Sequence, residues 1–328
     1  MIKVISFGEA LVDMLSSRVG EDQSEHSGSV NERFTKFPGG APANVAAAIG
    51  KLGGYSYFAG KVGADMFGDF LIESLEALDV RTDYVKQTSE AKTALAFVSL
   101  DSTGERSFEF YRGPSADLLF TPNEFQPEWF NGQGIFHFCS NTLTEPGILE
   151  ATQAGLEKAR AAGWLVSFDM NLRNNLWPKG TDAFAPVWAC VEQADLVKLS
   201  TEELTFLCRD KNETEVLQRI LNSGASLVLV TDGEKPLRYF TPCHYGSIEP
   251  RNVQMVDSTA AGDAFIGGLL YQLSDRDITA ANLKALGEDP EKLEDILTFA
   301  SACGAHAVTH AGAFTSLPNL EEVSAYLS

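Results

Sequence analysis

Short apolar runs that alternate with longer segments of helical period are the feature that most constrains the fold of this chain. Six runs have the length and composition of buried strands: Lys3–Phe7, Tyr55–Gly60, Ile135–Cys139, Leu165–Asp169, Leu196–Leu199 and Leu227–Thr231. Five segments between them have a helical pattern: Pro42–Leu52, Phe67–Leu78, Glu145–Ala162, Ala183–Gln193 and Thr214–Ser223. This alternation predicts a three-layer α/β/α sandwich around a mostly parallel sheet, as a single domain over residues 1–328.

Two strand-like segments interrupt this pattern. Residues Ala94–Leu100 and Arg106–Tyr111 are joined by a short polar turn, which predicts an antiparallel hairpin. The hairpin fits either a projecting flap, completed by the polar segment after Asp13, or an edge of the main sheet. The pattern alone favours neither. We adopt the flap as the expectation, a small β-strand lid formed by about residues 13–37 and 91–117.

The charge balance excludes some classes of function. The 328 residues include 45 acidic and 25 basic side chains, a net charge of −20, which disfavours nucleic acids and anionic membrane surfaces as partners. A bound polyphosphate must then be held by local devices such as helix termini, a few cations or a metal. The five cysteines include no Cys-x-x-Cys pair, and no apolar run approaches the ~20 residues of a membrane span. We therefore expect a cytoplasmic protein.

The strongest local motif is the string Val256–Gly268, which reads VDSTAAGDAFIGG. Small residues at 260–262 allow backbone amides to crowd together, and the apolar period that follows predicts a helix. Successive amides at a helix N-terminus form an anion site. Asp263 lies at the same terminus, where a carboxylate is useful if it takes a proton from an attacking hydroxyl. An isolated Gly-Asp would instead be read as an acid favoured by the helix dipole.

Two further motifs lie near the N-terminus. In Pro38–Ala46, the glycines Gly39 and Gly40 allow close backbone approach, and Asn44 falls one turn inside the helix that follows. Its amide offers a donor and an acceptor to a ligand, although a local helix-start bond is an equally good interpretation. Asp13 follows the first strand, at the sheet edge where open α/β folds bind ligands.

The three motifs described above, in their order along the chain, resemble those of the ribokinase-like (PfkB) family of carbohydrate kinases. Within that family, the resemblance is to the bacterial fructokinases. The resemblance runs from Gly8 to Pro318 and includes both family signatures, the Gly-Gly region continuing to 62–68 and the string 257–263. The segments 39–44, 105–117 and 168–173 carry the fructokinase character. Ser258 and Ala260 replace the threonine and glycine frequent in the family, which we expect to be mild changes.

The resemblance implies roles for particular residues. Asp263 would be the general base, the amides of Ala260, Ala261 and Gly262 would hold the transferred phosphoryl group, and Arg173 would point into the site. Those implied to bind the sugar are Asp13, Gly39, Gly40, Asn44, Phe97, Phe110 and Arg112. Those implied to bind ATP are Lys198, Glu203, Thr231, Gly233, Ser301 and Ala302, with Glu203 also organising Mg²⁺ through water. Those implied to bind a monovalent cation, usually potassium, are Asp257, Thr259, Ala307, Gly312 and Ser316.

The sequence therefore predicts an ATP-dependent sugar kinase that phosphorylates a primary hydroxyl, with D-fructose as the expected substrate and fructose 6-phosphate as product. Two alternatives remain. One keeps the chemistry on another sugar, such as 2-keto-3-deoxygluconate, ribose or a riboside, because changes of pocket side chains alter selectivity easily. The other is a non-catalytic sugar-binding regulator, which would need neither Asp263 nor the anion loop. The family resemblance also implies a homodimer formed through the lid.

Overall fold

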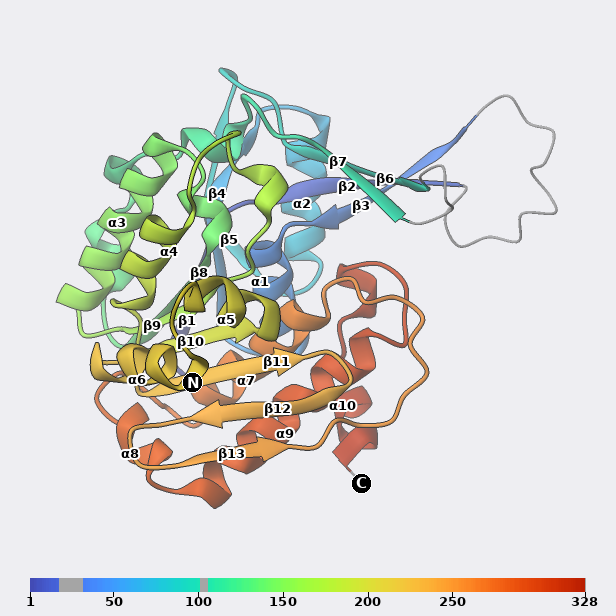
Figure 1. Ribbon diagram of the computed structural model, residues 1–328. Coiled ribbons are helices and arrows are strands. Elements are labelled where there is room, and N and C mark those ends of the chain that lie inside the picture. Colours follow the sequence, from blue (N-terminus) through green and yellow to red (C-terminus); the bar gives the residue numbers. More distant parts are fainter. Residues whose placement is uncertain (18–31, 101–105, 328) are drawn as a thin grey trace.

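A nine-stranded sheet forms the centre of the molecule in the computed structural model, which describes residues 1–17, 32–100 and 106–327 (Figure 1). Its strands are β1 (Lys3–Phe7), β4 (Ser56–Gly63), β5 (Arg81–Thr88), β8 (Gly134–Cys139), β9 (Leu165–Asp169), β10 (Leu196–Ser200), β11 (Leu227–Asp232), β12 (Lys235–Phe240) and β13 (Tyr245–Ile248). Their order is β13-β12-β11-β10-β9-β8-β1-β4-β5. Only the pairs that involve β12 are antiparallel, so the expected mostly parallel sheet is confirmed.

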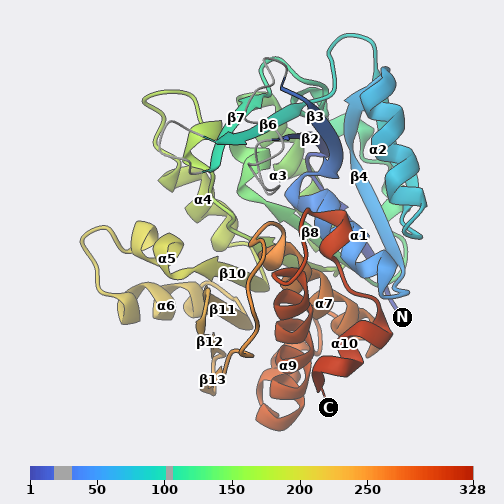
Figure 2. The same cartoon turned by 90° about the vertical axis from the view of Figure 1, so that its right-hand side faces the viewer.

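Helices cover both faces of this sheet (Figure 2). One face packs against α1 (Ala41–Lys51), α2 (Met66–Glu76), α7 (Ala261–Asp275), α8 (Leu283–Gly287) and α9 (Pro290–Ala307), with α10 (Leu320–Leu327) on α9. The other packs against α3 (Pro146–Ala161), α4 (Phe184–Val191), α5 (Thr201–Cys208) and α6 (Glu213–Asn222). Alternate strand residues enter opposite cores, as the period of a strand requires. No helix of the described residues is long and apolar enough to cross a membrane, and the five cysteines are free thiols.

A separate four-stranded sheet, the lid, projects from the main body (Figure 1). It consists of β2 (Leu11–Ser16), β3 (Phe34–Gly39), β6 (Leu95–Leu100) and β7 (Arg106–Tyr111) in the order β3-β2-β6-β7. The hairpin therefore belongs to a flap and not to an edge of the main sheet. Residues 18–31 and 101–105, which are part of the expected lid, lie outside the described residues.

Strand register separates the two faces of the lid. Asp13 is paired with Ala96 across β2 and β6, and Ala96 is paired with Phe110 across β6 and β7. These three residues share one face because aligned residues point to the same side of a sheet. Phe97 is the next residue along β6, so it lies on the opposite face. There its ring centroid is 5.1 Å from that of Tyr111. The lid thus presents Phe110, but not Phe97, on the side of Asp13.

Candidate active site

The first turn of α7 carries the candidate catalytic carboxylate. Asp263 is only 8% exposed, and its Oδ2 accepts a hydrogen bond of 2.7 Å from Nδ2 of Asn44 in α1. Ala261 and Gly262 precede it in the same turn, where amides lack intrahelical partners and favour an anion. Ala260 caps the helix with a φ of 57°, a left-handed conformation that costs an alanine about 1 kcal/mol. The replacement of glycine at this position is therefore less mild than the sequence suggested.

The surroundings of Asp263 raise its pKa to about 6. Burial is the largest cause, and the negative charge of Asp169 acts in the same direction. The hydrogen bond from Asn44 and the positive charges of Lys198 and Arg173 oppose the rise. The exposed Arg173 is thus close enough to influence the carboxylate, in line with its expected place. A carboxylate with a pKa of about 6 is a stronger base than an ordinary aspartate and remains ionised at pH 7.5.

A buried ion pair lies below the first turn of α7. Nζ of Lys198 in β10 donates to both carboxylate oxygens of Asp169 in β9 at 2.9 Å. A Cβ on Gly262 would lie 3.2 Å from this Nζ, so the glycine lets the ammonium group approach the amides closely. Burial alone would lower the pKa of Lys198, but the charges of Asp169 and Glu203 outweigh it and raise the pKa. Sequence reasoning gave Asp169 no role, although it ends a buried strand.

Asp13 brings a second carboxylate to the site from the lid. Burial and the charge of Asp263 raise the pKa of Asp13 to about 7, which shows that the two carboxylates interact. A Cβ on Gly39, in the neighbouring strand β3, would overlap the carboxylate of Asp13. Gly40 follows with a φ of 103°, which favours glycine. The Gly-Gly pair is therefore required both by this carboxylate and by the turn into α1.

Two buried amide oxygens near these carboxylates have no hydrogen-bond partner among the described residues. They are Oδ1 of Asn44 and Oδ1 of Asn141, and their side chains are 5% and 4% exposed. The amide nitrogens of the same side chains are committed, to Asp263 and to Glu9 respectively. Buried polar atoms without partners are rare and point to a missing donor. A ligand hydroxyl or a water molecule would supply one.

Arg112, which is expected to bind the sugar, makes several contacts within the protein. Its guanidinium is buried and donates to Asp117, to the backbone oxygen of Asn141 and to Thr144. The positive charge is balanced by Asp117, whose Oδ2 lies 2.7 Å from Nε. Each nitrogen of the guanidinium has one protein partner, and Nη1 and Nη2 each keep a second N–H. The motif identified the residue, but not the neighbours that occupy it.

Glu203 has a structural function. It forms a capping box at the start of α5, in which Oε2 accepts from the backbone nitrogen of Ser200 at 2.7 Å. Its Oε1 accepts from the backbone nitrogen of Leu172 at 2.6 Å. The carboxylate thereby fixes the segment after β9 against α5. Each oxygen keeps a further lone pair that can accept from water.

The other residues expected at the nucleotide differ in their exposure. Thr231 is half-buried near the end of β11, and Gly233, with a φ of 53°, forms the turn into β12. Ser301 is partly exposed on α9. Ala302 is fully buried in a cluster that includes Tyr271, so it offers no surface to an adenine ring. The expectation for Ala302 is therefore not supported by its packing.

Two of the residues expected at a monovalent cation, Thr259 and Gly312, bind the carboxylate of Asp257. Its Oδ1 accepts from both N and Oγ1 of Thr259, and its Oδ2 accepts from the backbone nitrogen of Gly312. Ala307 and Ser316 are buried in the adjacent segment. Carboxylate, hydroxyl and backbone oxygens suit a hard cation. No group of three or more His, Cys, Asp or Glu side chains within residues 1–17, 32–100 and 106–327 could hold a metal ion.

Comparison with known proteins agrees with this arrangement. The chain is 41% identical over 325 residues to a probable fructokinase-2 of Arabidopsis thaliana, covering 99% of this chain and 95% of the relative. It superposes with a TM-score of 0.93 and 45% identity on an ATP-bound fructokinase from Xylella fastidiosa, covering 99% and 98% of the two chains. It superposes with a TM-score of 0.85 and 36% identity on a double mutant of Vibrio cholerae O395 fructokinase bound to fructose, ADP and a potassium ion. That superposition covers 100% of this chain and 99% of the mutant chain. A model of the pfkB family carbohydrate kinases matches residues 1–320. This chain belongs to the pfkB family of carbohydrate kinases.

Proposed function

We propose that this chain transfers the γ-phosphoryl group of ATP to a primary hydroxyl of D-fructose and releases fructose 6-phosphate and ADP. The observation that carries the proposal is the buried carboxylate of Asp263 in a helix turn whose amides can receive a phosphoryl group. The similarity to fructokinases over nearly the whole chain supports the choice of fructose. A pure sugar-binding protein would need neither the carboxylate nor the anion site.

The proposed reaction is a single in-line displacement. The sugar oxygen forms a bond to the γ-phosphorus while the bond from that phosphorus to the β–γ bridging oxygen breaks. Asp263 accepts the hydroxyl proton and later releases it to solvent. The amides of the first turn of α7 and the ammonium group of Lys198 stabilise the charge on the transferred group. Arg173, which is near Asp263 and exposed, can contact the phosphates as they arrive.

The acceptors around Asp263 favour a neutral polyol over a sugar acid. Asp13 and Asp263 supply carboxylate oxygens, and Asn44 has a free amide oxygen. Sugar hydroxyls can donate to all of these groups, whereas a carboxylate such as that of 2-keto-3-deoxygluconate would be repelled by the two aspartates. The positive charge of Arg112 is already paired with Asp117, which weakens its attraction for a sugar carboxylate. This argument disfavours one of the alternative substrates.

Magnesium is expected to enter with ATP. The carboxylates of Asp13, Asp169, Glu203 and Asp263 outnumber the two cations, Lys198 and Arg173, so the phosphates need further neutralisation. Glu203 would hold the metal through water, and the metal would supply charge neutralisation at the phosphates. Omission of Mg²⁺ should abolish turnover while fructose still binds. Turnover in excess EDTA would contradict this role.

A potassium ion would fit the oxygens gathered around Asp257. We expect the ion to hold the segment at Gly312 against the loop that leads into α7. Turnover should therefore be higher in KCl than in the same concentration of choline chloride. An Asp257→Asn variant should lose this difference. Equal rates in both salts for the unchanged protein would argue against a functional cation.

The outer face of the lid supports the proposed homodimer. The ring centroid of Phe97 is 5.3 Å from that of Phe34 and 5.1 Å from that of Tyr111. The side chains of Phe34 and Tyr111 are 38% and 58% exposed. Such an aromatic cluster fits a second copy of the chain. Sedimentation should give a dimer for the unchanged chain and a monomer for Tyr111→Ser combined with Phe34→Ser. A monomeric unchanged protein would refute the dimer.

The function is tested by measuring ADP release over a panel of fructose, ribose, 2-keto-3-deoxygluconate and a riboside. We expect the highest kcat/KM with fructose. Turnover with ribose alone would refute the choice of sugar, and no turnover with any sugar would favour the regulator. An Asp263→Asn variant should bind fructose but lose several orders of magnitude in kcat. Near-normal activity in that variant would overturn the assignment of the base.

The pH profile provides a second test of the base. Asp263 must be ionised to accept a proton, so kcat/KM should rise with pH and level off above the carboxylate pKa values. Asp13 and Asp263 titrate as an interacting pair, with values of about 7 and about 6. The rise should therefore be centred between about pH 6 and 7. A rate that is constant down to pH 5 would exclude Asp263 as the base.

A further inference from the structure

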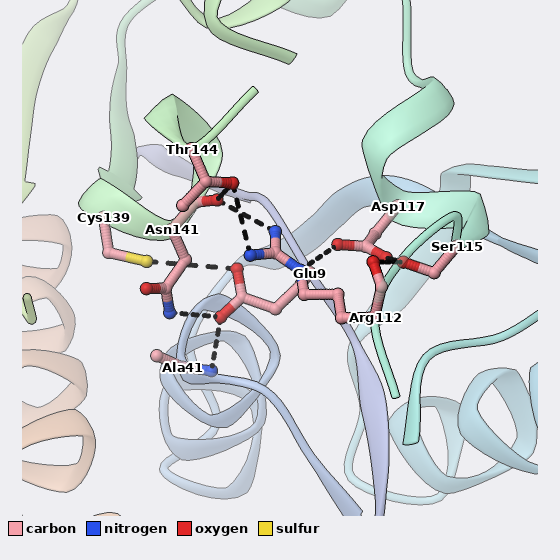
Figure 3. Close-up of polar contacts among 8 residues, drawn as sticks. All are labelled: Glu9, Ala41, Arg112, Ser115, Asp117, Cys139, Asn141 and Thr144. Carbon is pink, nitrogen blue, oxygen red and sulfur yellow. Dashed lines mark hydrogen bonds and ion pairs between the residues drawn. The ribbon is translucent and has the colours of Figure 1, made fainter. Parts of the chain in front are cut away.

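A buried charged network joins the base of the lid to the main sheet (Figure 3). We call the residues Glu9, Arg112, Asp117 and Asn141 the lid-base network. Each of them is less than 8% exposed. They come from the link between β1 and β2, from the residue after β7, and from the short helices η1 (Ala116–Leu119) and η4 (Ser140–Leu143). Segments that are far apart in the chain therefore meet at the point where the lid leaves the body.

Arg112 binds three residues through separate nitrogen atoms. Nε donates to Oδ2 of Asp117 at 2.7 Å, Nη2 donates to the backbone oxygen of Asn141 at 2.9 Å, and Nη1 donates to Oγ1 of Thr144 at 3.5 Å. Ser115 holds the other oxygen of Asp117 at 2.6 Å. Only a planar guanidinium presents donors in these directions. The end of β7 is thus fixed against the carboxyl end of β8.

Glu9 extends the network to the start of α1. Its Oε1 accepts from Nδ2 of Asn141 at 2.9 Å and from the backbone nitrogen of Ala41 at 3.3 Å. Figure 3 shows the carboxylate of Glu9 between these donors and the guanidinium of Arg112. Burial raises the pKa of Glu9, although the charge of Arg112 opposes the rise. A carboxylate is kept here at an electrostatic cost, which calls for an explanation.

The network lies next to groups that the proposed reaction uses. Ala41 begins the helix in which Asn44, three residues later, binds Asp263. Asn141 is held at its amide nitrogen and at its backbone oxygen, which leaves its Oδ1 as a buried acceptor without a partner among the described residues. Glu9 also lies two residues before the start of β2, the strand that carries Asp13. A shift of Glu9 or Arg112 would therefore change the separation of the sugar-binding groups.

We propose that Glu9 and Arg112 are positioning residues that lock the base of the lid onto the start of α1 and so set the geometry of the sugar site. The proposal rests on the proposed function for the identity of the sugar. It assigns Arg112 no contact with substrate. The affinity for ATP, whose expected residues lie on β10, α5, β11, α9 and the turn after β11, should not depend on the network.

The test compares pairs of variants. Arg112→Lys keeps the charge but cannot reach three separate partners, and Glu9→Ala removes the acceptor. Both should raise the KM for fructose by about ten- to a hundred-fold, with the KM for ATP unchanged. Glu9→Gln retains an oxygen at the position of Oε1 and should restore most of the affinity. Arg219→Met is the control, because it removes an ion pair of 2.7 Å between α6 and Glu192 at the end of α4, outside the lid base. It should lower the melting temperature and leave both KM values unchanged.

Hydrogen exchange provides a measurement that does not depend on turnover. Amides of β6 and β7 should exchange faster in Arg112→Lys and in Glu9→Ala, and at the normal rate in Glu9→Gln and in Arg219→Met. Unchanged exchange in the first two variants, or an unchanged KM for fructose in both, would overturn the proposal. If the unchanged protein phosphorylates no sugar, the proposed function fails, while the exchange experiment still decides whether the network positions the lid.

Discussion

Replacing Asp263 by asparagine should stabilise the protein while it removes the proposed base. In the folded state the pKa of this carboxyl is raised from 3.8 to about 6, chiefly by burial. A difference of that size corresponds to about 3 kcal/mol by which ionised Asp263 destabilises the folded protein. The cost is complete above pH 6, falls as the folded protein takes up a proton between about pH 6 and 4, and is absent below pH 4. Asparagine carries no charge and can keep the hydrogen bond from Asn44.

Urea unfolding of both proteins at pH 8 and pH 4.5 measures this effect. The variant should gain up to about 3 kcal/mol at pH 8 and much less at pH 4.5. Asp65→Asn is a control of opposite sign, because hydrogen bonds from Thr93 and Gly68 outweigh burial and lower the pKa of Asp65. That variant should lose stability. An Asp263→Asn protein that is less stable than the unchanged chain at pH 8, or a gain equal at both pH values, would refute the reasoning.

Three further substitutions test the geometry of the site. Gly39→Ala places a methyl group against the carboxylate of Asp13 and should raise the KM for fructose without changing that for ATP, measured by steady-state kinetics. Lys198→Met leaves the Asp169 carboxylate buried without its cation and should cost about 3–5 kcal/mol in urea unfolding. Adding Asp169→Leu to it should recover much of that loss. Ala260→Gly relieves the left-handed φ of 57° and should stabilise the chain by about 1 kcal/mol with kcat retained.

Buried strands were predictable because each has a short apolar run with distinct ends. The bounds of β1 and β9 are those expected, and β8 and β10 differ by one residue. The strands that the sequence did not reveal lie toward the edges of the sheet. In β5 (Arg81–Thr88) no residue is buried, and β13 (Tyr245–Ile248) is likewise partly or fully exposed. Edge strands need no continuous apolar run, so the pattern that identifies central strands is absent from them.

The parts of the site that a local motif determines were predictable from the sequence. The hydrogen-bond and ion-pair partners that come from distant segments were not. The string at 260–263 indicated the start of α7 and its carboxylate. It did not reveal that Lys198 pairs with Asp169 or that Arg112 is occupied, because such partners come from other strands and short helices. Phe110 lies on the face of the lid that carries Asp13 and Phe97 on the other, and this depends on strand register. A shift of one residue would exchange the two faces of a strand. These features depend on tertiary contacts that local periodicity does not contain.

The same environment that destabilises the free protein makes Asp263 a better base as the reactants assemble. Burial already raises its pKa to about 6, and a sugar that displaces water would raise it further. The negative phosphates of ATP would act in the same direction, whereas Lys198 and Arg173 limit the rise and keep the carboxylate ionised before transfer. Proton uptake by Asp263 therefore becomes more favourable as the phosphoryl group is placed next to the hydroxyl. With water alone in the sugar site the burial would be smaller and the base weaker, which favours transfer to sugar over hydrolysis of ATP.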